Sequence, residues 1–307
     1  MRHSSSHSLP KNKSKYNPFL SSDDMPLLDY VMKCLDGMSR NKAKAILTGN
    51  GVRVDGKTVT RHDFNVKPGM LVEISRYRGA EPEEDLGRYF GVVYEDDHLI
   101  VVDKSDGVMS VGVGHNSLNM KRLLDDYFVR TRQRFHPHLV HRLDTRTSGL
   151  MVYAKTIETQ QLFIHDWRGY VQDRRYVAVV EGAIDQPEGH IESWLIDTPW
   201  LKVISSKTNN GGKWASTDWK LLRTNGSLSL VELHLHTGRK NQIRVHMHDL
   251  GYPIVGDRKY GCDYDPINRM CLHAFRLAFY HPITGELLHF ETPFPNDFLR
   301  LMDRPAR

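Results

Sequence analysis

Residues 136–156 of the chain read HPHLVHRLDTRTSGLMVYAKT. Within this stretch, Asp144 follows a strand-like apolar run and precedes a Thr-Ser-Gly sequence at 147–149, which favours a turn. The alternating residues 150–154 then predict a second strand. We therefore expect Asp144 at the end of a strand. Taken alone, a carboxylate in this position could be a nucleophile, a metal ligand or the residue that forms an Asx turn.

The sequence around this stretch predicts a domain dominated by β-sheet. Two β-rich runs, 92–94 and 99–102, predict a hairpin at its start. Regular alternation of strands and helices is missing from the sequence, and so is a Gly-rich phosphate loop. We therefore expect a mixed, largely antiparallel α+β domain over 89–300. Its other elements are expected as strands at 150–154, 176–180 and 228–235, and as helices capped by Ser117 and Thr156.

The segment 25–76 has a different pattern. Apolar residues at helical spacing predict an amphipathic helix after Met25, and a second short helix is expected after the candidate N-cap Ser39. Short alternating runs separated by Asn-Gly, Asp-Gly and Pro-Gly pairs then predict strands joined by tight turns. A compact α/β module of about fifty residues follows from this pattern.

The sequences MSRNKAKAILTGNGVRVDGKTV (38–59) and VKPGMLVEI (66–74) make this module resemble the ribosomal S-four-like RNA-binding domain. The resemblance implies that Arg40, Lys42 and Lys44 on the second helix contact phosphates of structured RNA. The residues alone leave open a second interpretation, in which the three cations are ordinary surface charges.

Composition limits the remaining possibilities. A chain of 307 residues predicts about two domains, and 42 basic against 37 acidic residues give a net charge of +5, which favours a polyanionic partner. Residues 1–24 are rich in Ser and basic groups and are expected to form a disordered tail, and 77–88 have the composition of a linker.

Cysteine usage and hydropathy bear on the compartment. Cys34, Cys262 and Cys271 show no Cys-x-x-Cys spacing, which favours reduced thiols in the cytoplasm. The apolar runs are far shorter than the ~18 residues of a membrane span, and the N-terminus lacks the apolar run of a secretory signal. We expect a cytoplasmic protein that does not insert into membranes.

Four segments carry a second resemblance, which runs from about Met25 to Asp297. They are HRLD (141–144) with TSGL (147–150), RRYVAVVEG (174–182), TGRKNQIRVHMHDLGYPIVGDRKYG (237–261) and LHAFRLAFYHPITGE (272–286). In these residues and in this order, the chain resembles the RluA/RluD-type pseudouridine synthases. The resemblance implies an isomerase that converts uridine to pseudouridine in RNA. It favours large-subunit ribosomal RNA as the substrate, with transfer RNA as an alternative.

The resemblance also implies a set of site residues. Asp144 is the essential group, either as a nucleophile on the sugar or as a base on the ribose, and Arg244 is its cationic partner. A buried carboxylate needs such a partner. Tyr176 would stack on the uracil, and Leu277 would form the apolar wall opposite. Arg142, Arg239 and Lys240 would contact a flipped nucleotide or its backbone. No cofactor or metal is implied, and a monomer is expected.

Two features depart from the family pattern. Asn241 stands where a His is usual, and Ser105-Asp106 replaces a Pro-containing pair after Lys104. We expect these changes to affect RNA positioning more than the chemistry.

Two other functions compete with this interpretation. His234 and His236 could serve a metal-dependent nuclease, but they alternate with apolar residues and are expected on an exposed strand face without clustered carboxylates. A noncatalytic RNA-binding or ribosome-assembly protein could keep the same fold. The presence of Asp144, Tyr176 and Arg244 favours the enzyme.

Overall fold

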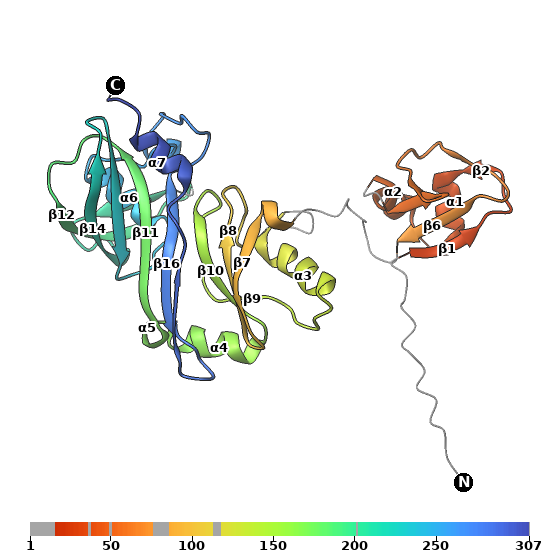
Figure 1. Ribbon diagram of the computed structural model, residues 1–307, viewed down its shortest axis with the longest axis horizontal. Helices are drawn as coiled ribbons and strands as arrows, with labels where there is room; N and C mark the ends of the chain where they lie inside the picture. The colour runs from red at the N-terminus through yellow and green to blue at the C-terminus, as the bar shows by residue number, and fades with distance from the viewer. Residues whose placement is uncertain are drawn as a thin grey trace, which may run out of the picture. The chain divides into compact units, whose positions relative to one another are not determined.

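The computed structural model describes residues 16–35, 38–48, 51–75, 86–112, 118–200 and 202–306. The chain divides into two compact units, 1–85 and 86–307 (Figure 1). Most of the predicted linker 77–88 lies outside the described residues, but Leu86–Arg88 form a short 3-10 helix, η1, that belongs to the second unit.

In its described residues, the first unit contains two helices, a four-stranded sheet and a two-stranded sheet that share one core. The sheet order is β1-β6-β3-β4, and β2 pairs with β5. Asp55 and Gly56 have φ of 49° and 76°, as the predicted tight turn between β3 and β4 requires. The elements are β1 (Tyr16–Leu20), β2 (Met25–Pro26), α1 (Leu27–Cys34), α2 (Arg40–Thr48), β3 (Val52–Val54), β4 (Lys57–Thr58), β5 (Asn65–Val66) and β6 (Leu71–Ser75).

The prediction of a disordered tail over 1–24 is wrong for residues 16–20, and residues 1–15 lie outside the described part of the chain. β1 pairs antiparallel with β6 from Tyr16↔Ser75 to Leu20↔Leu71. Tyr16 is buried, and the Arg53 guanidinium lies 4.5 Å from the centre of its ring. Local composition could not show this strand, because its stability comes from the edge of β6, a partner about 55 residues away.

The second unit is built on one mixed sheet, eleven strands of which lie in the described residues. The main path runs β13-β12-β14-β15-β11-β16-β10-β8-β7, with β9 beside β10 and β17 beside β16. Only the β10–β16 pairing is parallel among these strands, so the expected largely antiparallel α+β domain is confirmed.

The bounds of the elements agree with the expected strands and hairpin. The strands are β7 (Phe90–Glu95), β8 (Leu99–Lys104), β9 (His138–Leu139), β10 (Ser148–Ala154), β11 (Val171–Glu181), β12 (Glu188–Asp197), β13 (Val203–Ser206), β14 (Lys213–Thr224), β15 (Leu228–Leu235), β16 (Leu272–Tyr280) and β17 (Leu287–Glu291). The helices are α3 (Met120–Arg130), α4 (Ile157–His165), α5 (Trp167–Tyr170), α6 (Gln242–Asp249), η2 (Arg258–Tyr260) and α7 (Asn296–Met302).

Helices α3 and α4 cover opposite faces of the β8–β10 part of this sheet. Along β8, Ile100 and Val102 join the core cluster that contains α3, whereas Leu99 and Val101 join the cluster that contains α4. Thr156 caps α4, as predicted, by accepting a hydrogen bond from the Thr159 amide at 3.2 Å. The cap of α3 is Asn119, whose side chain accepts from the Arg122 amide, and the predicted cap Ser117 lies outside the described residues. Within the described ranges, no helix is long and apolar enough to cross a membrane.

Candidate active site

Asp144, Tyr176 and Arg244 come together in the second unit, at a cavity and a smaller pocket beside it. The cavity has a volume of about 640 Å³, and Asp144 and Tyr176 are among its lining residues. A smaller pocket beside it is lined by all three side chains. Asp144 lies in the loop between β9 and β10, Tyr176 lies on β11 and Arg244 lies on α6. The fold therefore joins three segments that are far apart in the sequence.

Hydrogen bonds fix the loop on both sides of Asp144. The Ser110 hydroxyl donates to the Leu143 carbonyl at 2.6 Å and accepts from the Leu143 amide at 3.1 Å. The buried Lys104 ammonium donates to the Thr145 carbonyl at 3.2 Å. Burial lowers the pKa of Lys104 to about 8, although the nearby carboxylates Asp106 and Asp144 oppose the shift. The backbone that presents the Asp144 carboxylate is thus held by two buried polar side chains.

Gly149 lets the strand that follows this loop approach β16 closely. Its φ is +114°, and a Cβ atom there would lie 2.2 Å from the Ala274 carbonyl oxygen. The parallel pairing of Gly149 with Ala274 requires that contact. As a result, the start of β16 lies beside the Asp144 loop, and its Leu272 lines the smaller pocket.

The prediction that Leu277 forms the apolar wall of the site is wrong. Leu277 is 2% exposed and belongs to the core cluster of Leu150 and Phe163, whereas Tyr176 and Leu272 belong to another cluster. Leu272, five residues earlier on the same strand, supplies the apolar side chain at the pocket. Both leucines lie in one apolar strand, so spacing alone could not show which one faces the carboxylate.

Arg244 is held between two carboxylates. Its Nη1 donates to Asp144 Oδ2 at 3.0 Å, and its Nε and Nη2 donate to the two oxygens of Asp257 at 2.7 and 2.8 Å. The Asp257 side chain is only 1% exposed. Burial lowers the pKa of the Arg244 guanidinium, but the hydrogen bonds and charge of Asp257, with the charge of Asp144, outweigh burial and raise it. The predicted contact between Asp144 and Arg244 is present, and the arginine is both charged and oriented.

Asn241 belongs to the same network. Its Oδ1 accepts from Arg244 Nη1 at 3.2 Å, and its Nδ2 donates to the Tyr260 hydroxyl at 3.0 Å. Asn241 precedes α6 with a φ of 54°, a left-handed conformation that Asn tolerates. The departure from the family pattern at this position therefore lies in direct contact with the arginine that holds Asp144, although we expected it to affect RNA positioning more than the chemistry.

Tyr176 presents an aromatic ring to the cavity from within the sheet. It is 8% exposed, and the pairing of β11 with β16 shifts register between Arg175 and Tyr176. Burial raises the pKa of the phenol, and the charge of Asp144 acts in the same direction while Arg174 opposes it. At neutral pH the ring is therefore an uncharged platform next to the carboxylate.

The cavity wall is rich in cations. The basic side chains that line it are Arg142, Arg168, Arg174, Arg239 and Lys240. Arg142 is exposed, Arg239 donates to the Trp214 carbonyl at 2.9 Å, and Lys240 forms an ion pair with Asp197. This charge distribution suits a polyanionic ligand.

A family model described as RNA pseudouridylate synthase matches residues 98–249, a range that contains Asp144, Tyr176 and Arg244. The chain is 33% identical to an RNA pseudouridine synthase of Bacillus subtilis, YjbO, over 87% of this chain and 95% of that protein. The chain belongs to the RNA pseudouridine synthase family. The enzyme is therefore an isomerase that converts uridine to pseudouridine.

Two further comparisons support the family and the fold. The enzyme is 31% identical to the ribosomal large subunit pseudouridine synthase D of Pasteurella multocida, over 86% of each chain. Human RNA pseudouridylate synthase domain containing 1 shares the fold with a TM-score of 0.57 and 23% identity, over 71% of this chain and 96% of the human chain. The second unit, 222 of 307 residues, is about 72% of the chain, so the match with YjbO also includes part of the first unit.

The basic residues predicted in the first unit are exposed on α2 of the enzyme. Lys42 and Lys44 are exposed, and Arg40 forms an ion pair with Asp29 at 3.0 Å. Exposed ion pairs of this kind contribute little to stability, so Arg40 can exchange this partner for another anion at small cost.

Three residues that support the site were missed from the sequence. Lys104, Asp257 and Leu272 lie outside the short motifs that define the reactive groups, although Asp257 and Leu272 fall in the two longer matching segments. Asp257 is 13 residues beyond Arg244 and follows Gly256, whose φ is +80°. A carboxylate in a turn is usually a local hydrogen-bond acceptor. The residue type and position of Asp257 therefore do not indicate that it accepts hydrogen bonds from an arginine.

The arrangement of the histidines corrects another expectation. His236 is exposed immediately after the end of β15, whereas His234 on that strand is half-buried, and the prediction that carboxylates are not clustered nearby is wrong. Asp218 accepts hydrogen bonds from both His190 and His236. The reason is the register of β12, β14 and β15, which brings these residues together from separate strands.

Proposed function

We propose that the enzyme isomerises uridine in large-subunit ribosomal RNA, and that Asp144 is the group on which the reaction depends. The observation that carries the proposal is the pairing of Asp144 with a clamped Arg244 beside an aromatic ring, in a cavity lined by cations. The name of the Pasteurella multocida relative supports ribosomal RNA as the substrate.

The reaction defines what the site must do. The bond between ribose C1′ and uracil N1 breaks, C1′ bonds to C5, the hydrogen on C5 leaves as a proton and N1 gains a proton. Asp144 in its ionised form can attack C1′ or remove the neighbouring ribose proton. Arg244 supplies the counter-charge and orients the carboxylate, because its guanidinium donates to Asp144 at 3.0 Å.

Base flipping is the second part of the proposal. A uridine stacked in an RNA helix keeps C1′ out of reach of a carboxylate inside a cavity, so the nucleotide must turn outward. The volume of about 640 Å³ is enough for a nucleotide. Tyr176 would then stack on the uracil, and Arg142, Arg239 and Lys240 would hold the flanking phosphates.

The third part of the proposal is that the first unit binds the RNA. Its α2 exposes Lys42 and Lys44, and the S-four-like element order suits contacts with the phosphates of structured RNA. We assign to it affinity for the RNA, and to the second unit the chemistry.

Release of tritium from [5-³H]uridine tests the reaction and its substrate class together, because isomerisation must remove the hydrogen from C5. Transcripts of large-subunit ribosomal RNA and of transfer RNA are incubated separately with the enzyme. We expect release from the ribosomal transcript alone. Release from transfer RNA alone would contradict the assigned substrate, and tight binding without release from either RNA, or from partly assembled ribosomal particles, would favour a noncatalytic assembly role.

A further inference from the structure

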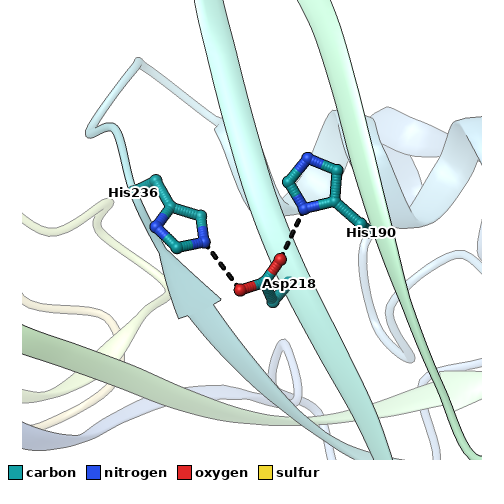
Figure 2. Close-up of side chains that lie close together, drawn as sticks. All are labelled: His190, Asp218 and His236. Atoms are coloured by element: carbon teal, nitrogen blue, oxygen red, sulfur yellow. Dashed lines mark hydrogen bonds and ion pairs between the residues drawn. The ribbon is translucent and has the colours of Figure 1, made fainter.

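A cluster of histidines and carboxylates lies on the solvent face of the sheet. Asp218 stands between two imidazoles, with Oδ1 2.5 Å from His190 Nδ1 and Oδ2 2.6 Å from His236 Nε2 (Figure 2). His234 completes the group, with its Nδ1 3.9 Å from Asp218 Oδ2. None of these side chains takes part in the contacts of Asp144 and Arg244 given above.

The strand register holds these side chains on one face. Asp218 on β14 lies directly opposite His190 on β12 and directly opposite His234 on β15. His236 is two residues beyond His234 and therefore points to the same side. His236 immediately follows β15, and its amide donates to the Ser216 carbonyl on β14 at 3.2 Å, so pairing along the sheet sets the spacing of the three side chains.

A second layer of carboxylates orients two of the histidines. His190 Nε2 lies 3.0 Å from Glu192, and His234 Nε2 lies 3.4 Å from Asp173. In both residues the other ring nitrogen, Nδ1, is turned toward Asp218. Histidines that bind metals usually donate their second N–H to a carboxylate in this way, which leaves the first nitrogen as a lone-pair donor.

We propose that His190, Asp218 and His236 form a binding site for a divalent transition-metal ion of the Zn²⁺ type. Their ligand atoms all lie within 4.8 Å of one another. Around tetrahedral zinc such atoms stand roughly 3.4 Å apart, so small side-chain rotations bring them into place. The ion takes the place of the protons that join Asp218 to the two imidazoles. Two nitrogens and one carboxylate oxygen favour Zn²⁺ over Mg²⁺ or Ca²⁺, which prefer oxygen ligands.

The site would lie at the rim of the reactive cavity. His234 and His236 line that cavity together with Asp144 and Arg142. Three protein ligands leave a tetrahedral ion one open position, which His234 or an exogenous oxygen can fill. Given the proposed function, which this step assumes, a phosphate oxygen of the bound RNA is the ligand for that position.

Metal content measures the site directly and without RNA. The untagged full chain is freed of metal with a chelator, dialysed against Zn²⁺ or Co²⁺, and analysed for bound metal. We expect one equivalent of tightly bound ion, an intense visible absorption for the cobalt form, and a rise in Tm of roughly 5 °C when Zn²⁺ stands about 100-fold above its Kd.

Variants separate this site from chance binding to surface histidines. We expect Asp218→Asn and the double variant His190→Ala/His236→Ala to lose the tightly bound metal ion and the rise in Tm. His289→Ala, which removes an exposed histidine from β17, keeps both. Substoichiometric binding by the unaltered chain, or equal binding by the variants of the cluster, would show that the residues form only a hydrogen-bonded network and overturn the proposal.

The phosphate ligand is tested separately. RNA affinity is measured with and without Zn²⁺, for the unaltered chain and for Asp218→Asn. We expect Zn²⁺ to tighten binding several-fold in the unaltered chain alone, and equal affinities would overturn the phosphate contact. Because metal binding is measured without RNA and tritium release can be measured in chelator, failure of the site and failure of the proposed function give different results.

Discussion

At the scale of single residues, the site depends on a carboxylate that does not line the cavity. Asp257 is almost fully buried and holds two nitrogens of Arg244, so it fixes the direction in which the remaining nitrogen reaches Asp144. It is absent from the residues that line the cavity. Asp257 is a positioning residue.

We expect Asp257→Asn to lower kcat by about 10- to 100-fold while KM changes little. The amide keeps the shape of the side chain but loses the charge that orients the arginine. The activation free energy should therefore rise by about 1–3 kcal/mol. Single-turnover rates and RNA binding measure the two effects. Asp303→Asn, which breaks an exposed ion pair with Arg223, serves as the control and should have no effect. Equal rates for the two variants would show that Arg244 does not need this support.

Single residues of the site differ in how far the sequence predicts them. Asp144, Tyr176 and Arg244 could be grouped in advance because the segments that carry them resemble those of one family, and the structure brings the three side chains together. Asp257 and Leu272 were missed, and Leu277 was placed wrongly, because supporting contacts depend on packing between segments that are distant in the chain.

At the scale of elements, β10 approaches β16 closely at Gly149. Gly149 has both a positive φ and a neighbouring backbone at 2.2 Å from where a Cβ would lie. Gly285 also has a positive φ of +73°, but its Cβ would meet nothing within 4 Å. The two glycines therefore separate backbone strain from steric contact.

We expect Gly149→Ala to cost at least twice as much free energy of unfolding as Gly285→Ala. The latter should cost about 1–2 kcal/mol, the strain of the left-handed conformation alone. Gly149→Ala must also push β10 away from β16, which moves the Asp144 loop and reduces activity. Urea unfolding and tritium release measure both quantities, and similar losses for the two variants would contradict the close approach.

Elements with local signals were predictable, whereas those that depend on distant partners were not. The Thr156 cap, the β7–β8 hairpin and the long strands follow from capping and alternation. β1 was missed because the N-terminal segment around YNPFL is poor in apolar residues and because the strand is held by β6. The β12–β14–β15 register, which brings together the histidine cluster, likewise has no local signature.

At the scale of the whole molecule, two regions of different composition became two units with separate cores. The boundary was predictable, because the acidic, Gly- and Pro-containing segment near residue 80 separates two patterns of periodicity. The extent of the first unit was not predictable, because its first strand, β1, lies in the segment that was expected to be a disordered tail.

Stability of the second unit should fall in mild acid. Burial lowers the pKa of His246 to about 4 and that of His273 to about 4, while unfolded histidines titrate near 6.5. Between these values the unfolded chain binds more protons, so the stabilisation present above pH 6.5 is lost as the pH falls toward 4. Each of these two histidines should lower the free energy of unfolding by about 2 kcal/mol at pH 5. Urea unfolding at pH 7, 6 and 5 measures the loss, and His246→Gln should show a shallower dependence on pH. An unchanged slope would contradict its neutral state in the fold.

We propose that one carboxylate, Asp144, performs the chemistry in a site that binds RNA through other groups. The most direct measurement compares Asp144→Asn with the unaltered enzyme on the same ribosomal transcript, in single-turnover tritium release and in RNA binding, with the exposed Asp97→Asn as control. We predict that Asp144→Asn binds RNA within about threefold of the unaltered enzyme and forms no detectable pseudouridine, while Asp97→Asn behaves normally. Pseudouridine formation by Asp144→Asn at the unaltered rate would contradict the account.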